Sequence, residues 1–300
     1  MNQLLSILCI TYNHDKFIGE AIESWLEQKT DFQIEIIIGD DCSTDKTVYE
    51  VKKHLKIHNN IKLIERAKNI GFINNFIETY KQCNGKYIAI CEGDDYWIDK
   101  NKLQMQVDFL ENNNNYVLTH TNVFTLNNEK KLCQLKPDSY NYENNIYNKN
   151  EISTLTAVFR NFNIDFSEKW SQFMMADWPL WITLSEKGRF KYFDKKTGVY
   201  RINETGIWQN GWKDKIGSER LLNEVAVLDF FLKKDSYNNN FIRMAIIHRL
   251  VNVAQFFNKV KSYKLNINKQ NLYYAFKSKE LFKELIVSFF IYPFQKIFSK

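Results

Sequence analysis

Residues 35–41 read Glu-Ile-Ile-Ile-Gly-Asp-Asp, and residues 87–95 read Tyr-Ile-Ala-Ile-Cys-Glu-Gly-Asp-Asp. In each stretch, acidic side chains directly follow a short apolar run of the kind that forms a buried parallel strand. In an open α/β sheet, ligands bind outside the carboxyl ends of the strands. The two stretches therefore predict carboxylates from separate strands at one sheet edge, where they would suit a metal ion and a polar ligand.

Strand and helix patterns alternate along the first 125 residues. Apolar side chains at helical spacing, such as Ile18, Ile22 and Trp25, lie between the apolar runs. Alternation at this spacing predicts βαβ units and an α/β fold with a parallel sheet. The predicted strands cover residues 4–11, 34–38, 61–64 and 87–91, and the predicted helices begin near residues 18, 48, 72 and 102.

Beyond residue 125 the chain becomes polar and rich in Asn until about residue 150, which predicts a loop or hairpin. The patterns that follow predict a strand, a helix, two short strands and then helices from residue 219 onward. We expect a main domain over residues 1–215 and a helical, basic extension over residues 216–300. The four elements before that extension are predicted at residues 152–160, 177–187, 190–192 and 197–202.

The five Cys residues are an odd number and include no Cys-x-x-Cys pair, which argues against a disulfide framework and a zinc site. The first residues lack the charged and apolar regions of a signal peptide. We therefore expect a protein of the reducing cytosol. The hydrophobic fraction of 44% is enough for a sizeable core.

The positive charge lies in the last 60 residues, where eleven Lys and Arg face two acids. The net charge is therefore +9 for residues 241–300 and −3 for residues 1–240. The apolar run Leu285–Phe294 is too short for a membrane-spanning helix, which needs about 20 residues. Two alternatives stay open: peripheral docking on the anionic inner leaflet, or packing against the main domain. No nucleic-acid-binding motif accompanies the charge.

Three motifs occur in order: Ser6–Asn13, Asp40–Thr47 and Glu92–Trp97. Together they resemble the family 2 inverting glycosyltransferases over roughly residues 3–205. The resemblance implies the GT-A fold, a mixed and mostly parallel sheet flanked by helices. It also implies transfer of a sugar from a nucleoside diphosphate donor, with UDP expected, to a hydroxyl of a growing surface glycan such as lipooligosaccharide or capsule. The acceptor would be a glycan or a lipid-linked glycan.

The resemblance also assigns roles. The position of Tyr12, between Thr11 and Asn13, lies near the nucleotide base, and that of Asp41 binds uracil. Asp94 and Asp95 correspond to the element that contacts ribose and sugar and binds the metal. We expect Asp95 to hold Mn²⁺ or Mg²⁺, because hard cations prefer oxygen ligands and neutralise a departing diphosphate.

Other donor-site assignments have open alternatives. Asn69 lies where the family has an Asn-x-Gly element, but a simple loop turn explains it equally well. Arg201 would meet the diphosphate, or it would form a surface ion pair. The five His residues show no metal-ligand spacing.

Inversion requires a general base that takes the proton of the acceptor hydroxyl. The resemblance assigns this role to Asp177, although a plain helix N-cap is the alternative. Trp97, Trp178 and Trp181 are predicted to line the acceptor site, with core packing as the other interpretation. Two other functions remain: a nucleotidyltransferase, which would need a Gly-rich loop after the first strand, and a non-catalytic sugar-nucleotide-binding module.

Overall fold

The computed structural model describes residues 5–126, 132–134, 146–147, 149–202 and 215–232, together with residues 242, 245, 246 and 249. The chain divides into two compact units, residues 1–206 and residues 207–300, and each is described by itself. The domain division predicted near residue 215 stays a prediction. The apolar run Leu285–Phe294 and its predicted membrane contact lie outside the described residues.

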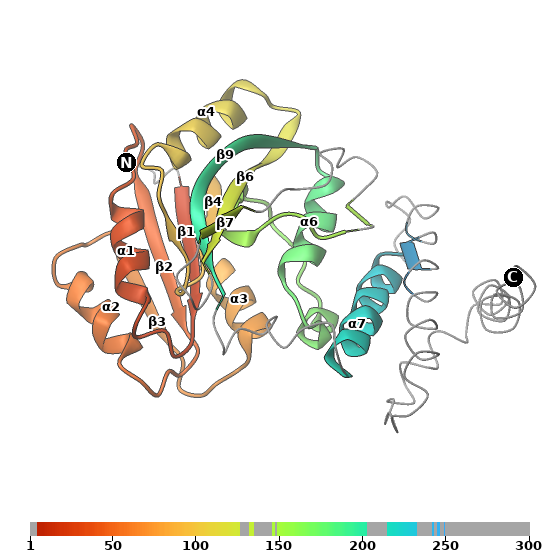
Figure 1. Ribbon diagram of the computed structural model, residues 1–300, viewed down its shortest axis with the longest axis horizontal. Helices are drawn as coiled ribbons and strands as arrows, with labels where there is room; N and C mark the ends of the chain where they lie inside the picture. Colours follow the sequence, from red (N-terminus) through yellow and green to blue (C-terminus); the bar gives the residue numbers. More distant parts are fainter. Residues whose placement is uncertain are drawn as a thin grey trace, which may run out of the picture. The chain divides into compact units, whose positions relative to one another are not determined.

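The first part of unit 1 alternates strand and helix, as the sequence predicts (Figure 1). The helical faces and apolar runs read from the sequence mark these elements to within a few residues. The elements are β1 Leu5–Thr11, α1 Ile18–Leu26, β2 Ile34–Asp40, α2 Thr47–Leu55, β3 Ile61–Glu65, α3 Phe72–Tyr80 and β4 Tyr87–Ile90.

The second part departs from the prediction in four strands, and the shortest of them, β5, is not predicted. The strand β6 was not predicted, because its middle residues 119–122 are polar and yet buried. The two short strands expected after residue 189 are one long strand, β9, and the strand expected from residue 152 is confined to β8. The elements are β5 Tyr96–Trp97, α4 Lys102–Asn112, β6 Tyr116–Leu126, β7 Leu132–Gln134, β8 Val158–Arg160, α6 Asp177–Ser185 and β9 Arg189–Arg201, with 3₁₀ turns at Thr154–Thr156 and Glu168–Gln172.

One mixed sheet carries all these strands in the order β3-β2-β1-β4-β8-β6-β9-β5, and β7 pairs with β6. Strands β3, β2, β1 and β4 are parallel, as are β6 and β9. The register sets Thr11 opposite Asp40 and Leu8 opposite Ile90. The predicted convergence of the two acidic stretches at one sheet edge is therefore confirmed.

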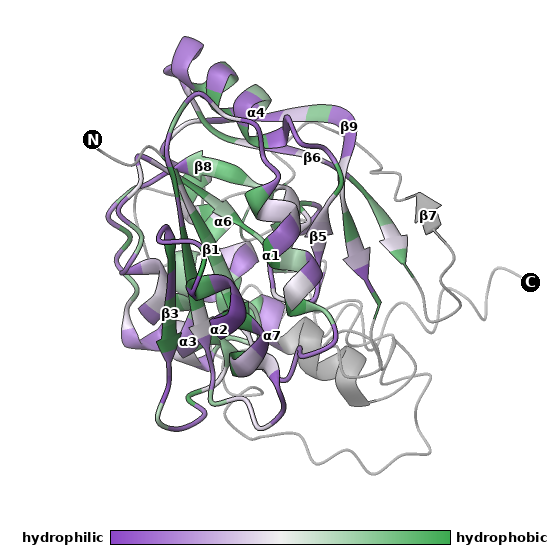
Figure 2. Cartoon of the chain, turned by 90° about the vertical axis from the view of Figure 1, so that its left-hand side faces the viewer, coloured by the Kyte–Doolittle hydropathy of each residue, from purple (hydrophilic) through white to green (hydrophobic). Residues whose placement is uncertain are grey.

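Helices cover both faces of the parallel part of the sheet. On one face, Ile7, Cys9 and Ile38 belong to a fully buried cluster with α1, α2 and α4. On the other face, α3 lies so close that a Cβ on Gly39 would meet Thr79 Oγ1 at 2.0 Å. Figure 2 shows β1 coloured mainly as hydrophobic and much of α2 and α4 as hydrophilic. Each large apolar side chain buried in this way contributes roughly 1.5–3 kcal/mol to folding.

Unit 2 contains α7, Lys215–Leu232, which agrees with the helical pattern predicted there. Within this unit the Arg249 guanidinium pairs with Glu224 at 2.7 Å. Among the described residues, no helix combines the length and the apolar character needed to cross a membrane.

Candidate active site

Three loops meet at the carboxyl end of β1. The N–H of Asp41 donates to the Thr11 carbonyl at 3.0 Å, which ties the loop after β2 to β1. The N–H of Gly93 donates to the Ile10 carbonyl at 3.2 Å, which ties the loop after β4 to the same strand. The backbone thus brings both acidic stretches against the Thr11-Tyr12-Asn13 turn.

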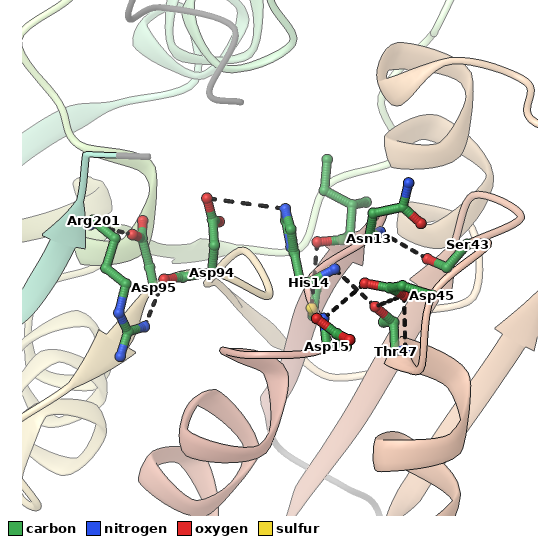
Figure 3. A network of polar contacts seen from close by, with 11 residues as sticks. Asn13, His14, Asp15, Ser43, Asp45, Thr47, Asp94, Asp95 and Arg201 are labelled. Atoms are coloured by element: carbon green, nitrogen blue, oxygen red, sulfur yellow. Dashed lines mark hydrogen bonds and ion pairs between the residues drawn. The ribbon is translucent and has the colours of Figure 1, made fainter. Parts of the chain in front are cut away.

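Asn13 joins the loop after β1 to the loop after β2 (Figure 3). It adopts a left-handed backbone conformation with φ of 57°, which Asn tolerates better than most residues. Its N–H donates to Ser43 Oγ at 2.9 Å, and its side-chain oxygen accepts the Thr44 N–H at 2.8 Å. Asn13 therefore shapes the predicted nucleotide pocket through contacts within the protein.

The side chain of Asp41 is buried, and its Oδ1 accepts the N–H of Ile70 at 2.7 Å. Asn69 is exposed and accepts the N–H of Gly71 at 3.1 Å, which is the simple loop turn that the sequence left open. Tyr12 is 44% exposed. The predicted base-binding residues therefore lie together at one edge, with the Tyr12 ring open to solvent.

The loop after β4 concentrates negative charge. Burial, then Asp94, and more weakly Asp177, raise the pKa of Glu92 to about 8. Burial, followed by the charges of Asp94 and Glu92, raises the pKa of Asp95 well above its usual range. Burial and then the same group of carboxylates raise the pKa of the Tyr200 hydroxyl. Strong perturbation by burial and like charge is typical of functional sites.

Asp95 and Arg201 fasten this loop to the end of β9. Asp95 is 1% exposed, and its Oδ1 accepts the Arg201 N–H at 2.8 Å. The Arg201 guanidinium donates to the Asp94 carbonyl at 2.6 Å, pairs with Glu20, and lies 4.3 Å from the centre of the Tyr96 ring. Arg201 is 8% exposed. These contacts favour the ion-pair alternative for Arg201 and give Asp95 an anchoring task.

Asp94 and His14 face each other across the site, as Figure 3 shows. His14 Nε2 lies 4.0 Å from Asp94 Oδ2, and the two side chains are 21% and 22% exposed. His14 Nδ1 is buried without a hydrogen-bond partner among the described residues. Sequence reasoning missed His14, because only the fold brings it to Asp94. Its position directly after the Tyr12-Asn13 pair was the available signal.

Asp177 is the first residue of α6, and Ala176 occupies the cap position without a side-chain cap hydrogen bond. The Asp177 carboxylate instead accepts a hydrogen bond from Asn150 Nδ2 at 2.6 Å. Its charge also reaches Glu92 and Tyr200. The structure therefore disfavours the N-cap interpretation and brings Asp177 to the second acidic stretch.

The three predicted acceptor-site tryptophans are buried. Trp97 donates its indole N–H to the Leu155 carbonyl at 2.8 Å, and Trp181 is fully buried with its ring edge-on to that of Phe159. Trp178 is 1% exposed. A ring that is buried in this way has no face for a sugar, so the core-packing alternative accounts for all three.

Within the described part of the chain, no group of three or more His, Cys, Asp or Glu side chains is arranged to hold a metal ion. The carboxylates of the loop after β4 nevertheless fit Mg²⁺ or Mn²⁺ in a complex with substrate. Magnesium usually binds one or two carboxylates and completes its shell with substrate phosphates and water. Asp94, partly exposed and carrying hard oxygen donors, suits that arrangement.

The sequence profile of Glycosyl transferase family 2 matches residues 6–170, more than half of the chain. The chain belongs to this family. Several relatives carry the name glycosyltransferase. A UDP-Glc:alpha-D-GlcNAc-diphosphoundecaprenol beta-1,3-glucosyltransferase of Escherichia coli is 26% identical over 75% of this chain and 88% of its own length.

An uncharacterized protein of Mycobacterium tuberculosis is 30% identical over 70% of this chain, and the match spans 62% of that relative's length. Solved structures share the fold at low identity. Staphylococcus aureus TarS 1–349 in complex with UDP-GlcNAc has a TM-score of 0.61 and 19% identity, covering 95% of this chain and 79% of TarS. A Pyrobaculum calidifontis mannosyltransferase in complex with GDP-Man and Mn²⁺ has a TM-score of 0.59 and 15% identity, covering 100% and 88%. The GT-A fold class predicted from sequence is confirmed.

Proposed function

We propose that this protein is an inverting glycosyltransferase that moves a sugar from a UDP-sugar to a hydroxyl of a growing surface glycan. The observation that carries the proposal is the position of Asp177. Asp177, the first residue of α6, lies close enough to the loop after β4 for its charge to raise the pKa of Glu92 in that loop. Asp94 lies in the same loop. A base and a charge-rich donor site in one place are what a single displacement requires.

In the proposed reaction, the Asp177 carboxylate accepts the proton of the acceptor hydroxyl. The hydroxyl oxygen forms the new bond to the anomeric carbon on the face opposite the diphosphate. The bond from that carbon to the diphosphate oxygen breaks, and its electron pair leaves with the diphosphate. Tyr12, Thr11, Asn13, Asp41 and Asn69 surround the proposed base and ribose subsite.

We revise one assignment within this proposal. The Asp95 carboxylate accepts the backbone N–H of Arg201, whereas Asp94 is partly exposed on the same loop. Asp94 would therefore hold Mg²⁺ or Mn²⁺, and Arg201 would steady the Asp94 backbone without touching the diphosphate. When bound, the cation supplies positive charge that stabilises the departing diphosphate. Support for a metal comes from the mannosyltransferase complex that contains Mn²⁺.

The donor and acceptor follow the relatives. UDP-GlcNAc in the TarS complex and UDP-Glc in the name of the Escherichia coli relative support a UDP-sugar. That relative's acceptor carries an undecaprenyl diphosphate, which supports a lipid-linked glycan here. Such an acceptor suits a cytoplasmic enzyme in peripheral contact with the inner leaflet through its basic C-terminal tail. Liposome flotation of the full chain against a version ending at Lys283 tests the contact; equal flotation removes it.

The full chain should be incubated with a panel of UDP- and GDP-sugars in Mn²⁺, Mg²⁺ or EDTA, and free nucleoside diphosphate should be measured. We expect UDP release from at least one UDP-sugar. Removing the base with Asp177→Asn should lower the rate about 10²–10⁴-fold. Asp108→Asn, on the exposed side of α4, is the matched control and should keep the wild-type rate.

Two results would contradict the proposal. If no nucleoside diphosphate is released from any donor, the enzyme assignment for this site is wrong. If Asp177→Asn keeps the wild-type rate, the reaction uses another base. Calorimetric binding of a UDP-sugar without turnover would instead favour a non-catalytic binding module.

A further inference from the structure

A short segment before the Thr154–Thr156 turn is fastened along α6. The Trp178 indole N–H donates to the Ile146 carbonyl at 2.7 Å. The Tyr147 hydroxyl donates to Glu186 at 2.9 Å, at the opposite end of the helix. The segment therefore contacts α6 near both of its ends.

Asn150 makes another contact between this segment and α6, and that contact falls on the proposed base. Its Nδ2 donates to Asp177 Oδ2 at 2.6 Å. Its Oδ1 is buried without a hydrogen-bond partner in the described part of the chain. Packing alone gives no reason for an amide here, because an apolar side chain of similar size would leave no buried acceptor unsatisfied.

This hydrogen bond acts on the ionisation of Asp177. An N–H donor favours the charged form of a carboxylate, as does the positive end of the α6 dipole. The charges of the loop after β4 act in the opposite direction. A catalytic base must be ionised and must also remain basic enough to accept a proton. A neutral amide allows both, because it supports the carboxylate without the strong ion pair through which Lys or Arg would reduce its basicity.

We infer that Asn150 is a positioning residue that fixes the rotation of the Asp177 carboxylate and keeps it ionised for proton abstraction. The inference rests on the proposed function, since it assigns Asn150 a task in that reaction. Asn150 does not contact the donor in this scheme. Its loss should therefore affect turnover rather than donor binding.

Asn150→Asp is the sharpest variant, because it keeps the size of the side chain while replacing the donor with a second carboxylate. Together with Asn150→Ala, it should lower kcat about 10–100-fold and leave the donor KM within about twofold. The acidic limb of the kcat/KM profile should move up by about one pH unit. Asn150→Gln, which keeps the amide, should recover part of the rate.

Tyr147→Phe is the matched control, because it removes a contact of the same segment that does not reach Asp177. Its kcat and pH profile should match those of the wild type, with thermal melts of all variants checking the fold. Equal losses in Tyr147→Phe and Asn150→Ala would mean that the segment matters only as a fastening, which overturns the inference. Wild-type rates and pH profiles in the Asn150 variants would overturn it while leaving the proposed function intact, whereas an inactive wild type would overturn both.

Discussion

The two acidic stretches occupy equivalent places at the ends of β2 and β4, yet the surroundings of their carboxylates differ. After β2, each of Asp40, Asp41 and Asp45 accepts a backbone N–H hydrogen bond. The donors to Asp40 and Asp45 lie within the stretch, at Ser43 and Thr47, and the donor to Asp41 is Ile70, in the loop before α3. The first stretch is therefore a scaffold in which local donors balance the negative charge.

After β4, burial and mutual repulsion dominate. The pKa values of Glu92 and Asp95 are raised by burial first and by neighbouring carboxylates second. A cation bound beside these carboxylates would favour their ionised forms and lower their pKa values. The comparison teaches that the same residue type at the same strand position can build a loop in one place and a reaction site in the other.

The largest test of this difference is Asp94→Asn. We expect UDP release to fall about 10²–10³-fold at saturating donor, because the remaining amide binds a hard cation poorly. The dependence of the rate on Mn²⁺ concentration should shift to higher concentration. Initial rates across a Mn²⁺ titration measure both effects.

Asp45→Asn is the counterpart in the first stretch and should leave the Mn²⁺ dependence unchanged. If both variants respond to Mn²⁺ like the wild type, the second stretch holds no cation. If Asp45→Asn alone shifts the response, the roles of the two stretches are exchanged.

The sequence predicts the βαβ half of the fold well, because apolar period and strand length point to the same elements there. It fails where burial and polarity disagree. Residues 119–122 of β6 read Thr-His-Thr-Asn and are nonetheless buried, with burial lowering the pKa of His120 to about 3. The Thr121 and Thr197 hydroxyls satisfy each other across β6 and β9 at 2.6 Å. Pairing of this kind depends on tertiary contacts, which periodicity does not report.

The same limit applies to the site. The order of the motifs predicts Asp41, Asp94 and Asp177 as site residues, and in the fold their loops lie at one sheet edge. Exposure then separates residues that look alike in the sequence: Asp95 turns inward to the Arg201 backbone, while Asp94 stays partly exposed. His14 and Asn150 gain their places only through contacts between distant segments.

A second test uses the glycine in or next to each stretch. A Cβ on Gly39 would meet Thr79 Oγ1 at 2.0 Å, and a Cβ on Gly93 would meet Thr11 Oγ1 at 2.7 Å. Each change to Ala should lower the free energy of unfolding by about 1–3 kcal/mol, with Gly39→Ala the more severe. Urea unfolding measures the effect, and only Gly93→Ala should also reduce turnover of the folded enzyme.

Gly19→Ala is the matched control, because nothing lies within 4 Å of its added Cβ in α1. It should be neutral or stabilising by up to about 1 kcal/mol, since Ala favours helices over Gly. Equal losses in all three variants would show that the close approaches are not what makes the two glycines necessary.

Glu92→Gln tests the repulsion in the second stretch through pH. Between its ordinary pKa of 4.5 and its folded pKa of about 8, Glu92 is ionised in the unfolded chain and protonated in the folded protein. The folded state then binds more protons, so the stability contributed by Glu92 falls as pH rises through this window. With EDTA present, Glu92→Gln should be more stable than wild type at pH 8 by up to about 4 kcal/mol and equal to it near pH 4. Chemical denaturation at the two pH values measures the difference, and a constant gap would contradict the assignment.

Asp45→Asn should show the opposite pH dependence with the smallest effect. Burial works against ionisation, but hydrogen bonds from Thr47 and the Asp15 N–H outweigh it, so the pKa of Asp45 lies below its ordinary value of 3.8. A carboxylate of this kind contributes stability above pH 4, and that stability is lost as pH falls through the folded pKa. We expect a loss below about 1 kcal/mol at pH 7 that disappears near pH 2, because the hydrogen bonds are local and partly solvated. A loss that grows toward low pH would mean that Asp45 shares the repulsion found after β4, and the contrast between the two stretches would fail at its weakest point.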